Sequence, residues 1–116
     1  SHSALHVPEV PANVQHAHYK CYAYVRPEQL AAGWNRDRIV AAINALGVPC
    51  YQGSCSEVYM EKAFDGTGWR PAAPLPTAHA LGTTSVMFLV HPTLTQAEVD
   101  TTCTAIAQVM QQATAA

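Results

Sequence analysis

The stretch GVPCYQGSCSEVY, from Gly47 to Tyr59, carries the side chains of this chain that are best placed for chemistry. Gly47 is expected to end a helix in a left-handed conformation, and Pro49 directly after it favours extended backbone. The residues that follow supply a flexible backbone, two hydroxyls, a thiol and a carboxylate: Gly53, Ser54, Cys55, Ser56 and Glu57. A polar loop of this kind on a rigid scaffold is typical of a binding site for a polar small molecule.

The side chains of this loop do not form a recognisable catalytic set. No G-x-S-x-G elbow surrounds Ser54 or Ser56, and the two lysines of the chain, Lys20 and Lys62, lie in segments that give no reason for a desolvated, reactive amine. Glu57 is a lone carboxylate, which more often caps a helix than transfers a proton. From the residues alone we assign no catalytic, cofactor-binding or metal-binding residue, and we expect a binding or accessory domain.

Histidines and cysteines raise a separate hypothesis, a zinc site. The candidate ligands are His16, His18, Cys50, Cys55, His79 and His91. Structural zinc sites usually show paired ligands such as C-x2-C with a second matched pair, and no such pair occurs in this sequence, so metal binding is the weaker hypothesis. The sequence also lacks a secretory signal, so the four cysteines are expected to be free thiols, with Cys21 and Cys103 as small core residues.

The composition favours one domain that normally packs against something else. The chain has 116 residues, of which 49% are hydrophobic and 12% are charged, about half of the usual ~25% charged fraction. A formal net charge of -2 without clusters of Lys and Arg argues against nucleic acid as a partner. No run approaches the ~20 apolar residues that span a bilayer, so we expect a soluble, cytoplasmic protein without a membrane partner.

The first half of the chain predicts a strand, a helix and a second strand. Residues 1–15 show no periodicity and are interpreted as a linker or vector-derived segment before a domain at 16–116, and the absence of a starting Met suggests a processed protein or an excised domain. Strict alternation from His16 to Arg26 predicts a half-buried strand whose second face, rich in tyrosine, resembles a contact surface. Asn35 caps a predicted helix that ends at Gly47, and residues 48–51 form the next strand.

The second half predicts a short helix, an irregular segment, a buried strand and a closing helix. We expect a helix at 57–64 capped by Ser56, no regular structure at 65–76, and one or two helical turns between Pro76 and Gly82. The apolar run at 85–90 predicts a strand covered on both faces. The closing helix is indicated by a capping box and an apolar stripe: Thr95, Glu98, Val99, Cys103, Ile106 and Met110. This order predicts a two-layer α+β sandwich.

Taken together, these segments resemble the C-terminal, small domain of the DegT/DnrJ/EryC1/StrS family of PLP-dependent sugar aminotransferases. The matching pieces are HAHYKCYAYV from His16, RDRIVAAINALGVPCYQGSCSEVY from Arg36 and LPTAHALGTTSVMFLVHPTLTQAEVD from Leu75, followed by the closing helix. Their order and spacing carry the resemblance, which covers most of the chain after residue 15. It implies a small, mainly antiparallel sheet packed by helices, as in the small domain of fold-type I transferases.

The resemblance also implies a function that this chain performs only as part of a longer protein. PLP, the reactive lysine and the phosphate-binding residues would belong to an N-terminal large domain, and the enzyme would be a homodimer. It would transfer an amino group from an amino-acid donor, typically glutamate, to a keto-sugar nucleotide in amino-sugar, polysaccharide or lipopolysaccharide biosynthesis. The isolated chain would be inactive.

The family places the loop after its second strand on the sugar-nucleotide side of the cleft, as one wall of it. Where many members have an HY-x-P-x-H pattern, this chain has YQGSCSEVY. The residues that the resemblance puts closest to the substrate are Tyr51, Ser54, Ser56, Glu57 and Tyr59. The alternative to this function is a free-standing α+β ligand- or protein-binding module without catalysis, which would use the same loop and strand face.

Overall fold

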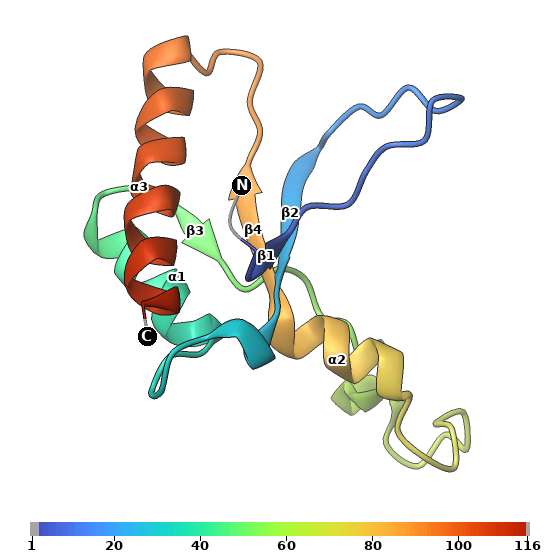
Figure 1. Cartoon of the computed structure of the whole chain (residues 1–116). Helices are drawn as coiled ribbons and strands as arrows, with labels where there is room; N and C mark the ends of the chain where they lie inside the picture. Colours follow the sequence, from blue (N-terminus) through green and yellow to red (C-terminus); the bar gives the residue numbers. More distant parts are fainter. Residues whose placement is uncertain (1–2, 116) are drawn as a thin grey trace.

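The structure, a computed structural model, describes residues 3–115 and has a four-stranded sheet covered on one face by two helices (Figure 1). The strands are β1 (Leu5–His6), β2 (Lys20–Val25), β3 (Cys50–Tyr51) and β4 (Ser85–Leu89). Their order in the sheet is β1-β2-β4-β3, and all neighbouring pairs are antiparallel. This confirms the α+β class and the small, antiparallel sheet expected from the sequence.

The helices α1 (Arg36–Ala45) and α3 (Gln96–Thr114) begin where their capping residues predict. The Asn35 side chain accepts a hydrogen bond from the backbone N–H of Arg38 at 2.8 Å. At the start of α3, Thr95 and Glu98 form the predicted capping box, in which each side chain bonds to the backbone of the other. Gly47 has a φ of 80° just beyond α1, as a left-handed helix end requires.

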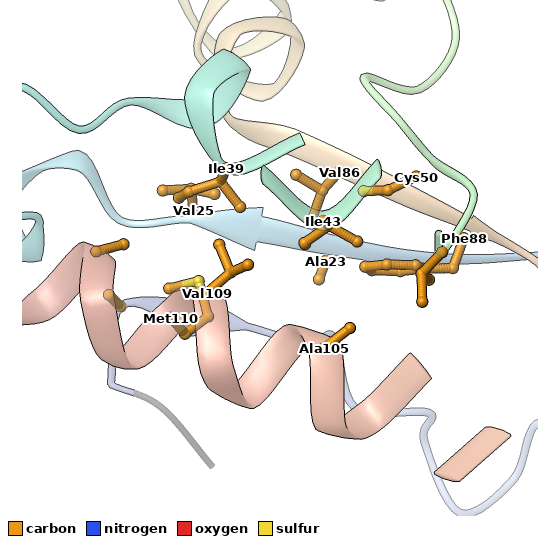
Figure 2. Close-up of a cluster of buried hydrophobic side chains, with 13 residues drawn as sticks. Ala23, Val25, Ile39, Ile43, Cys50, Val86, Phe88, Ala105, Val109 and Met110 are labelled. Atoms are coloured by element: carbon orange, nitrogen blue, oxygen red, sulfur yellow. The ribbon is translucent and has the colours of Figure 1, made fainter. Parts of the chain in front are cut away.

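The hydrophobic core lies between the inner face of the sheet and these two helices (Figure 2). Alternate residues of β2 and β4 point into it because successive strand side chains point to opposite faces. Its largest fully buried side chains are Ile39, Ile43, Met110, Val86, Val109 and Cys50. The opposite face of the sheet carries the tyrosines of β2 and is the face on which the candidate site lies.

Helix α2 (Pro76–Thr84) and the two 3-10 turns η2 (Val58–Met60) and η3 (Lys62–Phe64) form an arm that extends from the sheet, away from α1 and α3 (Figure 1). Pro76 opens α2, as predicted, but the helix continues through Gly82 to Thr84 and is longer than expected. A third 3-10 turn, η1 (Pro27–Gln29), follows β2. Because the arm extends away from the sheet, the radius of gyration of the chain is 16.3 Å, against about 13 Å for a compact domain of this length.

Two predicted elements are wrong. The helix expected at 57–64 is replaced by η2 and η3, and no side chain, Ser56 included, caps the first of them. Arg70 donates to the carbonyls of Tyr59, Met60 and Glu61 at 2.9–3.2 Å, so these oxygens are already bonded to a guanidinium.

The strand expected from His16 begins instead at Lys20. The cause is local: His18 has a φ of 47°, which breaks the extended backbone, and its N–H donates to His16 Nδ1 at 2.8 Å.

Two further expectations are corrected by burial. Residues 4–6 are not merely a linker, because Ala4 is completely buried and Leu5–His6 pairs with Val25 and Tyr24 of β2. Cys103 is not a core residue, because it is exposed. The strand predicted at 85–90 is confirmed over Ser85 to Phe88, which are buried, but β4 ends at Leu89, and Leu89 and Val90 are exposed. No helix of the described residues is long and apolar enough to cross a membrane.

Candidate functional site

The loop predicted to bind a ligand lies between the outer face of the sheet and α2. It leaves β3 at Gln52 and reaches η2 at Val58, and an open hollow lies on each of its two sides. The two hollows share Ser54, Cys55 and Ser56. The loop therefore forms a polar ridge between two concave surfaces.

We call the first of these surfaces the tyrosine hollow. It has a volume of about 650 Å³ and lies between two tyrosines of β2, the loop and the first turns of α2. It is lined by Tyr22, Tyr24, Ser54, Cys55, Ser56, Leu75, Pro76, Thr77, Ala78, Leu81 and Ser85. The lining combines aromatic rings, aliphatic side chains and hydroxyls, and all of these residues are uncharged.

We call the second surface the acidic hollow. It has a volume of about 620 Å³ and lies between the loop, η2, η3 and the C-terminal end of α2. It is lined by Gln52, Gly53, Ser54, Cys55, Ser56, Glu57, Met60, Glu61, Lys62, Gly82 and Thr83. Two carboxylates and one ammonium group face this hollow, so its formal charge is negative. A phosphate group would be repelled there more than attracted.

The structure brings together three of the five residues expected near a substrate. Ser54 and Ser56 line both hollows, and Glu57 lines the acidic hollow. Tyr51 lines neither: it lies on the outer face of the sheet opposite Met87 and is 47% exposed. Tyr59 also lines neither hollow, and it acts instead in a hydrogen-bond network that joins η2 to α2.

That network is centred on the Glu57 carboxylate. Its Oε1 accepts from the Tyr59 hydroxyl at 2.7 Å, and its Oε2 is 3.0 Å from His79 Nδ1. The Tyr59 hydroxyl in turn accepts from the backbone N–H of Leu75 at 2.9 Å. The hydrogen bond from Tyr59, followed by that from His79, lowers the pKa of Glu57 below its ordinary value. Because an ionised carboxylate only accepts, His79 Nδ1 carries the proton in this pair.

Arg36 holds the N-terminal end of the loop, at Gln52, in place. Its Nη1 donates to the carbonyls of Ser85 at 2.8 Å, Gly82 at 3.0 Å and Gln52 at 3.3 Å, while its Nε donates to Asp37 at 2.6 Å. The side chain is only 13% exposed. One guanidinium thus ties the end of β3 to the junction of α2 and β4. A second bond, from Ser85 Oγ to Gln52 O at 2.6 Å, supports the same contact.

The thiols near the site differ in their surroundings. Cys55 is exposed at the ridge, and its Sγ donates to Glu61 Oε1 at 3.3 Å. This hydrogen bond is the main cause that raises the pKa of the Cys55 thiol. Cys50 is buried in the core, and burial raises its pKa to about 11. All four cysteines are free, as the sequence predicts.

Residues 3–115 contain no group of three or more His, Cys, Asp or Glu side chains that could hold a metal ion.

Sequence reasoning missed Tyr22 and Tyr24 as individual site residues, although it identified their strand face as a contact surface. It also missed Arg36, Thr77 and Leu81. The tyrosines could have been found from their alternation on β2, which the sequence shows directly. Nothing in the sequence placed Arg36 or the α2 residues beside the loop, because their contacts join residues that are 16 to 49 positions apart.

Comparison with solved structures identifies the type of protein to which this domain is similar. An aminotransferase from Psychrobacter cryohalolentis is 52% identical over 95% of this chain, with a TM-score of 0.89. A DegT DnrJ EryC1 StrS aminotransferase from Brucella abortus shares the fold at 22% identity over 90% of the chain, with a TM-score of 0.71. The aminotransferase TlmJ from Streptoalloteichus hindustanus shares it at 15% identity over 97%, with a TM-score of 0.77.

The match covers nearly all of this chain but a minor part of each neighbour. The chain spans 29%, 26% and 28% of those three chains. No family model and no curated protein matches the sequence. The chain therefore resembles one part of an aminotransferase in sequence and in fold, and it shares the fold of a DegT DnrJ EryC1 StrS aminotransferase, the family that its sequence resembles.

Proposed function

We propose that this chain is the C-terminal, small domain of a PLP-dependent aminotransferase that acts on keto-sugar nucleotides, and that it supplies one wall of the substrate cleft. The observation that carries the proposal is the 52% identity to an aminotransferase over 95% of the chain, combined with coverage of only 29% of that aminotransferase. The remaining part of such an enzyme would hold the reacting groups. The sugar-nucleotide substrate follows from the resemblance in sequence order and spacing.

The residues of this chain do not fit PLP as its binding site. The cofactor needs a lysine in a closed pocket and hydrogen-bond donors for its phosphate. Neither lysine of this chain lies in a closed pocket. Lys20 lies on β2 with its ammonium 5.4 Å from the centre of the exposed Tyr19 ring, and Lys62 lines the acidic hollow beside Glu57 and Glu61. We therefore assign PLP, which supplies the electron sink for transamination, to the large domain.

The part left to this chain is recognition. The ridge at Ser54–Ser56 offers hydroxyls on both sides and is held in place by Arg36 and by Tyr22, whose hydroxyl is 3.0 Å from Ser54 Oγ. Such a preorganised surface binds and orients a polar substrate and excludes water from one side of it, without transferring protons itself.

The large domain and a second subunit are the proposed partners, in a cytoplasmic homodimer. The arm and its surroundings carry large apolar side chains that a lone domain would expose to water, with Trp69 at 77%, Met60 at 57% and Val58 at 54% exposure. Exposed apolar surface of this extent marks contact with another protein surface. The radius of gyration, larger than that of a compact domain, supports the same interpretation.

The test uses the full-length gene product beside the 116-residue chain. After incubation with PLP and reduction by borohydride, peptide mass spectrometry should find one modified lysine in the full-length protein, upstream of this domain. The full-length protein should also transfer nitrogen from glutamate to a keto-sugar nucleotide, whereas the short chain should not. A saturable adduct on Lys20 or Lys62, or full-length protein that binds no PLP, would contradict the proposal.

Sequencing upstream of the chain separates this proposal from the free-standing module. An open reading frame that continues upstream for a large domain with a PLP-binding lysine supports the aminotransferase. A gene that begins near Ala4 would instead favour a binding module that works without catalysis.

A further inference from the structure

We infer that the tyrosine hollow binds the hexose ring of the substrate, in contact with the rings of Tyr22 and Tyr24. This inference rests on the proposed function, in which the loop faces a sugar nucleotide. It goes further by choosing one of the two hollows, by naming the part of the ligand that enters it, and by assigning two strand tyrosines that the resemblance does not place at the site.

The chemistry of the lining matches a hexose. A pyranose ring has apolar C–H faces and hydroxyl edges, and it needs a surface that offers both kinds of contact. The hollow supplies aromatic rings from Tyr22 and Tyr24 and aliphatic carbon from Leu75 and Leu81. Its hydroxyls come from Ser54, Ser56, Thr77 and Ser85. A volume of about 650 Å³ has room for one ring with its substituents.

Charge separates the two hollows and fixes which end of the ligand can enter. The eleven lining residues of the tyrosine hollow include no Asp, Glu, Lys, Arg or His, so this surface binds a neutral group without desolvating a charge. The acidic hollow carries Glu57 and Glu61 against Lys62 and would repel a diphosphate. The neutral sugar therefore lies in the tyrosine hollow, and the diphosphate points out of it toward the rest of the cleft.

The hollow is also rigid where the ring would rest. The Tyr22 hydroxyl lies 3.0 Å from Ser54 Oγ, and Gly53 fits against the Tyr22 ring so closely that no side chain could stand between them. Ser85 Oγ donates to Gln52 O and anchors the floor to the loop. Contacts that are already in place before binding reduce the ordering cost that a ligand must overcome.

Backbone-amide NMR on the 15N-labelled 116-residue chain tests the inference with three probes: methyl glucopyranoside, uridine and UDP-glucose. We expect saturable shifts with methyl glucopyranoside, centred on Ser54–Ser56 and on Thr77–Ala78. Tyr24→Ala should weaken this binding by roughly fivefold, the effect of one aromatic contact. The matched control is Tyr19→Ala, because Tyr19 is 82% exposed and outside the hollow, and it should leave the affinity unchanged.

Circular dichroism of each variant verifies that it is folded. A Tyr22→Phe variant, which keeps the ring and loses the hydroxyl, gives a second readout and should retain most of the affinity.

The outcomes separate this inference from the proposed function. The hexose assignment would be overturned if methyl glucopyranoside changed no amide chemical shift in the tyrosine hollow. It would also be overturned if the Tyr24→Ala and Tyr19→Ala variants bound methyl glucopyranoside with equal affinity. Uridine that binds there in its place would also overturn it and assign the hollow to the nucleobase. UDP-glucose that binds through the acidic hollow would overturn it while leaving the aminotransferase proposal intact. If methyl glucopyranoside binds as expected but the full-length protein takes up no PLP, the proposed function fails and the sugar site remains.

Discussion

Gly53 lies against the ring of Tyr22, so close that a Cβ on Gly53 would stand 2.9 Å from Tyr22 Cε1. The glycine has a φ of 99°, a conformation that residues with side chains rarely adopt. The next residue, Ser54, meets the hydroxyl of the same tyrosine at 3.0 Å. The loop and the strand face are therefore one unit, and the position of the polar ridge depends on a residue without a side chain.

Replacement of Gly53 by alanine should destabilise the domain by roughly 1–3 kcal/mol, because the new Cβ meets Tyr22 and Ser85 Oγ in addition to the backbone strain. Gly68→Ala is the matched control: its φ of 74° imposes similar strain, but no heavy atom lies within 4 Å of a Cβ there. Urea unfolding followed by circular dichroism measures both variants. Equal losses in the two variants would show that the contact with Tyr22 does not matter.

Gly82 has the same relationship with Ser56, since a Cβ would stand 2.0 Å from Ser56 Oγ. Alanine in a helix normally stabilises by about 1 kcal/mol relative to glycine, but here the serine must rotate away. We expect Gly82→Ala to gain little stability and Ser56→Ala/Gly82→Ala to recover the helix gain. A double-mutant cycle of unfolding free energies should give a coupling of about 1 kcal/mol. Additive single effects would contradict this contact.

The parts of the fold that the sequence predicts correctly are those with a local cause. The N-cap at Asn35, the box at Thr95 and the left-handed Gly47 each depend on residues within four positions. The failures arise from contacts that are distant in sequence or from a single dihedral angle. Residues 57–64 form two 3-10 turns and not one α-helix, with Arg70 bound to three of their carbonyls, and the strand predicted from His16 starts late because of one positive φ at His18.

The candidate site is predictable to a similar extent. The polarity of Ser54 to Glu57 is visible in the sequence, and so is the tyrosine face of β2. The contact between the loop and this strand face is not visible in the sequence, because it depends on the direction in which α2 runs after residue 75. It also depends on Arg36, which donates to three carbonyls from two separate segments. Periodicity reports which face a residue occupies, but it does not report which other element lies opposite that face.

Arg36→Lys should weaken the domain by roughly 1–3 kcal/mol, because one ammonium cannot hold Asp37 and three carbonyls in the geometry that a guanidinium allows. The carbonyls of Gln52, Gly82 and Ser85 would lose a donor in a half-buried setting. Arg38→Lys on the same helix is the comparison: Arg38 donates to a single carbonyl, Gly33 O at 3.0 Å, and stacks on Trp34, so its replacement should cost less than that of Arg36. Calorimetric melting of both variants measures the difference, and equal melting temperatures would refute the role of Arg36.

Glu57 should make the arm sensitive to acid. The pKa of Glu57 is lower in the folded state than its ordinary value, because Tyr59 and His79 donate to the carboxylate. A group with a lowered folded pKa contributes stability that is present above its unfolded pKa and is lost as the pH falls through the folded pKa. Wild-type stability should therefore decrease as the pH falls below the ordinary glutamate pKa of 4.5, and Glu57→Gln should show a shallower decrease.

Urea midpoints measured above and below that pH, with Glu9→Gln on the exposed N-terminal segment as control, determine the contribution of Glu57. The control should follow the wild-type curve. A Glu57→Gln variant that follows it as well would mean that the Tyr59 and His79 hydrogen bonds do not favour the ionised carboxylate.

The cysteines should react in an order set by burial and by one hydrogen bond. The thiolate is the reactive form, so a raised pKa slows alkylation at about pH 8. Cys50 should resist iodoacetamide, because it is 2% exposed and its pKa is raised to about 11. Cys55 is exposed, but its thiol donates a hydrogen bond to Glu61, and this bond raises the pKa of the thiol. Glu61→Gln should therefore speed the alkylation of Cys55, while Cys103, exposed on α3, keeps its rate as the control within the same molecule. Peptide mass spectrometry resolves each site, and an unchanged rate at Cys55 in the Glu61→Gln variant would remove the hydrogen bond as the cause.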